Sequence, residues 1–112
     1  MFAMLMGLKS ISPQALHERM QRGALTIIDV NAAQSWLRAR VPGALNLGVD
    51  FDAAALPPDL AHALVFYCSN PLCRKAPGAA RRAKKLGYTN VFVMSAGISG
   101  WTDARLPVHS GN

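Results

Sequence analysis

The fold is decided between residues 63 and 86, which read ALVFYCSNPLCRKAPGAARRAKKL. The first five residues are apolar, which predicts a short strand that is covered on both faces. A helix should follow over residues 77–86, opened by a proline and ended by Gly87, because apolar side chains recur at helical spacing. These are Ala76, Ala79, Ala80, Ala83 and Leu86. A strand, a polar loop and a helix in this order predict a parallel α/β unit in which Cys68 directly follows the strand.

Three further strands are expected around this unit. Residues 25–29 (LTIID) are apolar and β-branched, which predicts a central strand covered on both faces. Residues 91–94 predict another, reached across the helix and therefore parallel to residues 63–67. A short strand should lie at residues 44–47, after Pro42 and Gly43 break the chain. We expect an α/β domain with a small, mostly parallel central sheet flanked by helices on both faces.

Two more helices are expected in the first half of the chain. Ser12 followed by Pro13 is an N-cap and first-turn pair, which predicts a helix over residues 12–22 that stops at Gly23. Asn31 is expected to cap a short helix over residues 32–38. Near the other end of the chain, Trp101 should close the core after a tight turn at Gly97.

Size and composition predict one domain over residues 1–112, with a core over about residues 8–108. The chain has 112 residues, of which 51% are hydrophobic and 16% charged, so it can bury a core of its own. Its longest apolar stretches fall well short of the roughly 18 residues that cross a bilayer, and residues 1–8 lack the features of a signal peptide. We therefore expect a cytoplasmic protein without a membrane partner.

The residues that commonly bind metals are few and scattered. The chain has two cysteines, Cys68 and Cys73, and its three histidines lie elsewhere in the sequence. This spacing does not assemble a four-ligand zinc site, and a disulfide closing so small a loop would add little stability. We expect no metal and no cofactor.

The positive charge is concentrated in the second half of the chain. The net charge is +6, and residues 57–112 carry seven basic and two acidic side chains. The basic segment, residues 74–85, would attract an anionic substrate or an acidic protein; the alternative is an ordinary solvated helix face. We do not expect nucleic-acid binding, because charge is its only marker here.

The loop after the central apolar run carries the candidate chemistry. Loop amides, the positive end of the following helix, and the basic side chains should favour the thiolate of Cys68, with a pKa below the usual value of about 8.5. The alternative is an inert buried cysteine. The candidate anion-binding residues of the loop are Ser69, Asn70, Leu72, Cys73, Arg74 and Lys75.

Four motifs together resemble a single-domain rhodanese over residues 8–108. They are IIDV at 27–30, RVPGALNL at 40–47, VFYC at 65–68 and KKLGYTNVFVMSAGISGW at 84–101. The resemblance implies a sulfurtransferase whose Cys68 takes a sulfane sulfur from a small anionic donor such as thiosulfate and holds it as a persulfide. It then passes the sulfur to a thiol or another thiophilic acceptor, which is a small molecule or a protein.

Two other functions remain open, and the length of the loop suggests the first of them. Cysteine, five residues and arginine resemble the rhodanese-related cell-cycle phosphatases and arsenate reductases, in which Arg74 would grip a tetrahedral oxyanion. Against that reading, the loop has no carboxylate, Tyr67 stands where such phosphatases usually have histidine, and Pro71 lacks an N–H. The third reading is a non-catalytic rhodanese-like binding module that uses the basic segment.

Three further residues are candidates for supporting roles. Cys73 either acts as a resolving thiol, attacking a Cys68 persulfide, or packs under the loop. Asp29 ends a predicted strand and should accept hydrogen bonds near the loop. Arg40 stands where the family commonly has histidine and is a second candidate support.

Overall fold

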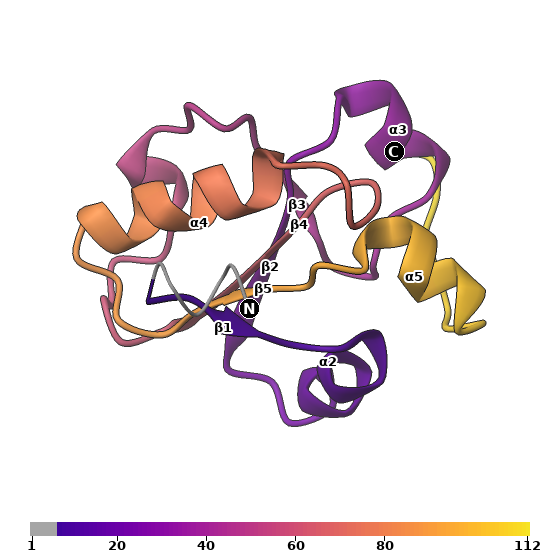
Figure 1. Cartoon of the computed structure of the whole chain (residues 1–112), viewed down its shortest axis with the longest axis horizontal. Helices are drawn as coiled ribbons and strands as arrows, with labels where there is room; N and C mark the ends of the chain where they lie inside the picture. Colours follow the sequence, from indigo (N-terminus) through magenta and orange to yellow (C-terminus); the bar gives the residue numbers. More distant parts are fainter. Residues whose placement is uncertain (1–6) are drawn as a thin grey trace.

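A five-stranded sheet forms the centre of residues 7–112, the part of the chain that the computed structural model describes (Figure 1). Its strands are β1 (Lys9–Ser10), β2 (Leu25–Asp29), β3 (Leu45–Asn46), β4 (Ala63–Tyr67) and β5 (Val91–Val93). They lie in the order β1-β5-β4-β2-β3, and every pairing is parallel. The strands predicted within residues 7–112 are confirmed. Residues 25–29 form β2, which lies inside the sheet between β4 and β3, so the expected central strand is confirmed.

Helices cover both faces of this sheet, as expected. They are α2 (Pro13–Met20), α3 (Ala33–Arg38), α4 (Lys75–Lys85) and α5 (Gly97–Asp103), with a 3₁₀ turn at Ala53–Ala55. Figure 1 shows α4 on one side of the sheet and α2 with α5 on the other. Within residues 7–112, none of these helices has the length and apolar character needed to span a membrane. Most of the segment 1–8, which suggested a cytoplasmic protein, lies outside the described residues.

The ends of the first two helices follow from their caps. The Ser12 hydroxyl accepts a hydrogen bond from the N–H of Ala15 at 3.1 Å, so the predicted N-cap of α2 is confirmed. The helix ends at Met20, two residues before the predicted end. The predicted capping of α3 by Asn31 is wrong, because Ala32 occupies the cap position without a side-chain hydrogen bond. The side-chain oxygen of Asn31 instead accepts the hydroxyl proton of Ser69.

Helix α4 begins at Lys75, two residues earlier than predicted. Pro77 therefore lies in the first turn, where a missing N–H costs no intrahelical bond. The helix faces the sheet with a stripe of small buried side chains, which are Ala76, Ala79, Ala80 and Ala83. Leu86 does not extend this stripe, because it lies just beyond the last turn and is 39% exposed.

Strand β4 divides its side chains between two cores. Leu64 and Phe66 point into the core under α4, whereas Val65 and Tyr67 point into the core under α2 and α5. This is the two-residue alternation of a strand. Cys68, the next residue, continues the first row and belongs to the core under α4. The strand thus places the cysteine between the carboxyl end of β4 and the first turn of α4.

The predicted tight turn at Gly97 opens a helix that the sequence analysis did not anticipate. Gly97 has φ +68°, a left-handed conformation that favours glycine, and it is the first residue of α5. Trp101 on this helix is fully buried, and its indole N–H donates to the carbonyl oxygen of Pro107 at 2.7 Å. The expectation that Trp101 closes the core is confirmed.

A buried hydrogen-bond network joins the two middle strands. The hydroxyl of Tyr67 donates to Asp29 Oδ2 at 2.7 Å and accepts from the N–H of Val41 at 3.1 Å, while the N–H of Asn31 donates to Asp29 Oδ1 at 2.8 Å. Burial raises the pKa of Asp29, and the hydrogen bonds from Tyr67 and Asn31 oppose that rise. The predicted role of Asp29 as an acceptor of hydrogen bonds is confirmed.

We expect Tyr67→Phe to lower the free energy of unfolding by about 1.5–3 kcal/mol at neutral pH, because it leaves the Asp29 carboxylate without a donor. The loss should shrink as the pH falls through the pKa of Asp29, since the protonated carboxyl no longer needs that donor. Urea unfolding followed at several pH values measures both effects. In an Asp29→Asn background the same substitution should cost less, and equal losses in the two backgrounds would contradict the assignment.

Candidate functional site

The candidate site is the loop of residues 68–74, which joins β4 to α4 and passes beside the start of α5 (Figure 1). Cys68 at its root is 3% exposed, whereas Arg74 at its other end is exposed. The carboxyl ends of parallel strands are where open α/β sheets place their ligand sites. The loop therefore has a buried thiol at its root and exposed basic side chains at its other end.

Helix α5 holds the root of the loop. The N–H groups of Ile98 and Ser99 donate to the carbonyl oxygens of Cys68 and Ser69, both at 2.9 Å. These amides belong to the first turn of the helix, where N–H groups lack intrahelical acceptors. Gly97 lets the start of α5 lie close to the backbone of the loop, because a Cβ at this position would be only 2.6 Å from the backbone carbon of Ser69. Sequence reasoning missed this support, although the spacing of Gly97 and Trp101 marks the helix that provides it.

At the tip of the loop, backbone amides donate hydrogen bonds to acceptors within the loop itself. The N–H of Leu72 donates to Asn70 Oδ1 at 2.9 Å, and the N–H of Cys73 donates to the carbonyl oxygen of Asn70 at 3.1 Å. Pro71 has no N–H to offer. The tip therefore forms a turn around Asn70, and its amides do not line an anion site as the sequence analysis expected.

The amides that reach the sulfur atoms come from the two ends of the loop. The backbone N–H groups of Ser69 and Ala76 act to lower the pKa of Cys68, and those of Ser69 and Lys75 act to lower the pKa of Cys73. Two of these three amides belong to the first turn of α4, which carries the positive end of the helix dipole. The Ser69 amide therefore favours the thiolate form of both cysteines.

Ser69 is also tied to the neighbouring strands. Its hydroxyl donates to Asn31 Oδ1 at 2.7 Å. The side-chain amide of Asn46 in turn donates to the carbonyl oxygens of Asn31 at 2.8 Å and Asp29 at 3.1 Å. This chain of hydrogen bonds connects the loop to β2 and β3. Asn31 and Asn46 were not among the predicted site residues, and neither has a local sequence signal that marks this role.

A small cavity of about 40 Å³ opens beside the two thiols. It lies between the first turn of α4 and the end of β5, and its lining includes Cys68, Cys73, Ala76 and Met94. A water molecule needs roughly 10–15 Å³ of such space, so the cavity has room for one or a few additional heavy atoms. It accommodates a single extra sulfur atom on Cys68 far more readily than a bulky substrate.

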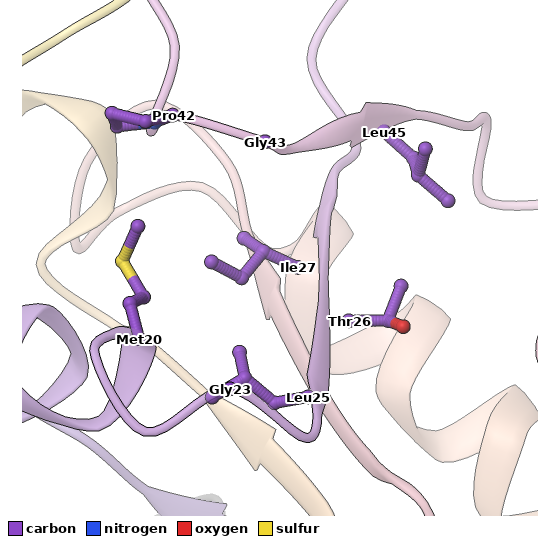
Figure 2. A pocket seen from close by; sticks show the side chains of 8 residues that line it. All are labelled: Met20, Gly23, Leu25, Thr26, Ile27, Pro42, Gly43 and Leu45. Carbon is purple, nitrogen blue, oxygen red and sulfur yellow. The ribbon is translucent and has the colours of Figure 1, made fainter.

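A larger cavity of about 320 Å³ lies at the start of β2, against the α2–β2 turn and the segment that leads into β3 (Figure 2). Its lining includes Met20, Leu25, Pro42 and Leu45. Figure 2 shows these side chains around the edge of β2. None of its lining residues is a Cys, His, Asp, Glu, Lys or Arg, so its lining offers no thiol and no ionisable group, and Thr26 supplies a hydroxyl. Its size alone does not make it the chemical site.

The structure shifts the pKa values of the two thiols in opposite directions. Burial, hydrogen bonding with Cys73 and the charge of that neighbour raise the pKa of Cys68 to about 11, against the effect of the Ala76 and Ser69 amides. Burial also acts against ionisation of Cys73. Its hydrogen bonds with Cys68 and with the Lys75 and Ser69 amides outweigh that effect and lower its pKa. The expectation that the pKa of Cys68 lies below its usual value is therefore wrong, because Cys68 is buried and donates its proton toward the carbonyl oxygen of Cys73.

The remaining predicted site residues are at the rim or elsewhere. Leu72 is 89% exposed, and Asn70, Arg74 and Lys75 are also exposed. Arg40 donates to the carbonyl oxygens of Trp36 at 3.2 Å and Gly111 at 2.8 Å and stacks over the Trp36 ring. Its charge acts on the buried Asp29 and Tyr67 pair. Arg40 is thus tied to α3 and to the C-terminal segment, and its supporting role at the loop stays a prediction.

Three comparisons with known proteins agree on one family. The family model described as "Rhodanese-like domain" matches residues 12–104. The chain is 29% identical to thiosulfate sulfurtransferase GlpE of Haemophilus influenzae over 92% of this chain and 96% of that one. It is 31% identical to an HTH-type transcriptional regulator of Mycobacterium tuberculosis over 91% of its own length but only 45% of the regulator. A Bacillus halodurans protein of known crystal structure superposes with a TM-score of 0.83 at 20% identity, covering 91% of this chain and 77% of that one.

We expect iodoacetamide to modify Cys73 at lower pH than Cys68, because the pKa of Cys73 is lowered and that of Cys68 is raised to about 11. Alkylation rates at each cysteine, followed by peptide mass spectrometry across a pH series, measure the order. In Cys73→Ser, Cys68 should react at lower pH than in the wild type, since a neighbour that raises its pKa is gone. Modification of Cys68 before Cys73 in the wild type would contradict this assignment.

We expect Gly97→Ala to destabilise the protein by at least about 1–2 kcal/mol, the cost of a left-handed conformation for an L-residue, with the clash against Ser69 in addition. It should also alter the reactivity of Cys68, because the loop root must move. Urea unfolding and Cys68 alkylation measure the two effects. Gly78→Ala on α4 is the matched control: its Cβ meets nothing within 4 Å, so it should leave both unchanged or slightly improve stability. Equal behaviour of the two variants would refute the role of Gly97.

Proposed function

This chain belongs to the rhodanese-like domain family, and on that premise we propose that it is a sulfurtransferase that carries sulfane sulfur on Cys68. The substrate class is a small anionic sulfur donor such as thiosulfate. The acceptor is a thiol or another thiophilic group, in a small molecule or a protein. The relation to a thiosulfate sulfurtransferase over nearly the whole of both chains supports this choice.

The proposed reaction is a double displacement. The Cys68 thiolate attacks the outer sulfur of thiosulfate, a new sulfur–sulfur bond forms at Cys68, and sulfite leaves with the electron pair of the broken bond. An acceptor nucleophile then attacks the outer sulfur of the Cys68 persulfide and regenerates the thiolate. The exposed basic side chains of Arg74 and Lys75 would attract the anionic donor to the rim.

The single observation that carries the proposal is the small cavity next to Cys68. It leaves about 40 Å³ beside the sulfur, against a lining that is largely apolar. The Ser69 and Ala76 amides at the Cys68 sulfur and the first turn of α4 would stabilise the negative charge of a persulfide. An additional sulfur atom thus has both a space and hydrogen-bond donors.

The same geometry weakens the phosphatase and arsenate reductase reading. The carbonyl oxygen of Cys73 lies 3.5 Å from Cys68 Sγ, where it would repel an oxyanion. The amides of Leu72 and Cys73 are already bonded to Asn70, so few remain to hold a tetrahedral group. The loop also has no carboxylate to protonate a leaving group.

The reading as a non-catalytic binding module rests on the basic face of α4, where Arg81 and Lys85 are exposed. An exposed basic helix face is common in soluble domains and needs no partner. It does not account for the buried cysteine with its amides and cavity. The basic face is compatible with a protein acceptor of sulfur as well as with a docking role.

We expect the reduced protein, incubated with thiosulfate and weighed intact, to gain one sulfur atom or to release one sulfide per chain. Cys68→Ser should do neither. The readouts are intact mass and a sulfide assay. The proposal fails if neither product forms with thiosulfate or with an organic persulfide donor. Turnover of an aryl phosphate or reduction of arsenate, without sulfur transfer from either donor, would favour the oxyanion reading.

A further inference from the structure

The structure holds two free thiols at one small cavity. Cys68 and Cys73 both line the space of about 40 Å³, and neither is in a disulfide. Cys68 Sγ lies 3.5 Å from the carbonyl oxygen of Cys73, so the two residues are in direct contact. A single thiol would be enough for the double displacement described above. The second thiol therefore needs an account of its own.

The positions of the two thiols are complementary. Cys68 is almost completely buried, whereas Cys73 is partly exposed and packs against the edge of the same core. The turn around Asn70, closed by the N–H groups of Leu72 and Cys73, folds the chain back so that residue 73 approaches residue 68. Since the carbonyl group of Cys73 contacts Cys68 Sγ and both cysteines line the same small cavity, the two thiols are neighbours in one site.

We propose that Cys73 is the second reacting thiol of this site, and that it displaces the outer sulfur from a Cys68 persulfide as hydrosulfide. This proposal rests on the sulfurtransferase activity proposed above and adds a second fate for its persulfide, in which the outer sulfur leaves as hydrosulfide and does not pass to an acceptor. The product is a Cys68–Cys73 disulfide. An external thiol, such as a small dithiol or a dithiol protein, must then reduce that disulfide to restore the starting state.

The first step of the proposed cycle needs only one negative charge on the pair. When the pair carries one negative charge, the lowered pKa of Cys73 and the raised pKa of Cys68 favour the charge on Cys73 and the proton on Cys68. As Cys68 attacks thiosulfate, its proton passes to the Cys73 thiolate. The sulfur–sulfur bond of thiosulfate breaks and sulfite leaves. The products are an anionic Cys68 persulfide, a neutral Cys73 thiol and sulfite, with the total charge unchanged.

The second step returns that proton. The Cys73 thiol gives it to the outer sulfur of the persulfide, and the Cys73 sulfur attacks Cys68 Sγ. The bond between Cys68 Sγ and the outer sulfur breaks, and hydrosulfide leaves with the electron pair. The two cysteine sulfurs are oxidised to the disulfide, and the sulfane sulfur is reduced to sulfide. The external thiol then supplies the two electrons that reopen the disulfide.

The test is a single turnover without added reductant. Reduced, desalted wild-type protein receives a small excess of thiosulfate, and sulfide release, free thiols and intact mass are followed. We expect one sulfide per chain, loss of both free thiols and a mass that corresponds to the internal disulfide. Cys73→Ser should release no sulfide and should accumulate the Cys68 persulfide, visible as one added sulfur atom.

A displaced thiol provides the matched control. The double variant Cys73→Ser with Leu60→Cys restores the number of thiols, but Leu60 lies before the amino end of β4, at the opposite end of the strand from Cys68. This variant should behave like Cys73→Ser. In the wild type, the rate of sulfide release per chain should not change when the protein is diluted tenfold at a fixed, large excess of thiosulfate, because both thiols belong to one chain.

The outcomes separate this proposal from the one on which it rests. If the wild type and Cys73→Ser both keep a stable persulfide and release no sulfide, Cys73 is not the resolving thiol and the sulfurtransferase function stands. If sulfide release per chain from the wild type slows when only the protein is diluted and thiosulfate is held constant, the attacking thiol comes from another molecule and the proposal is wrong. If neither protein takes up sulfur from thiosulfate or an organic persulfide, and neither releases sulfide, the proposed function itself fails.

Discussion

The structure depends on one constraint: β4 is covered on both faces, so each of its side chains must suit one of two separate cores. Leu64 and Phe66 pack under α4, and Val65 and Tyr67 pack on the opposite side. The strand cannot shift by one residue without exchanging these two sets. The same alternation places Cys68 on the side of Leu64 and Phe66, so its thiol faces the first turn of α4. The position of the nucleophile is therefore a consequence of core packing.

The same burial requires every polar group near β4 to find an internal partner. The Tyr67 hydroxyl meets this need by joining Asp29 to the N–H of Val41, which ties the middle of the sheet to the segment before β3. Burial and the neighbouring Asp29 raise the pKa of Tyr67, so its hydroxyl remains a donor. The network holds β2 and β4 together at the end where the loop begins, and the loop starts from a rigid base.

The loop combines a fixed root with a self-contained tip. Helix α5 holds the Cys68 and Ser69 carbonyls, and the Asn70 turn uses the amides of the tip. What remains for chemistry is a narrow space, three amides from the ends of the loop, and two neighbouring sulfur atoms. That combination suits a reaction in which one sulfur atom is added and removed. The turn at Asn70 also has a consequence, because it brings Cys73 back toward Cys68.

The sequence by itself determined most of the elements, the parallel arrangement and the position of Cys68, because apolar runs, a capping serine and an alanine stripe act through local periodicity and local hydrogen bonds. The resemblance in its motifs also identified the family. Only the tertiary structure decided the role of Asn31, the support of the loop by α5, and the order of the two thiol pKa values. Each of these depends on groups distant in sequence, as with Ser69 and Asn31, or on the depth of burial, as with Cys68. Local sequence patterns carry no information about either, because desolvation and long-range hydrogen bonds exist only once the chain has packed.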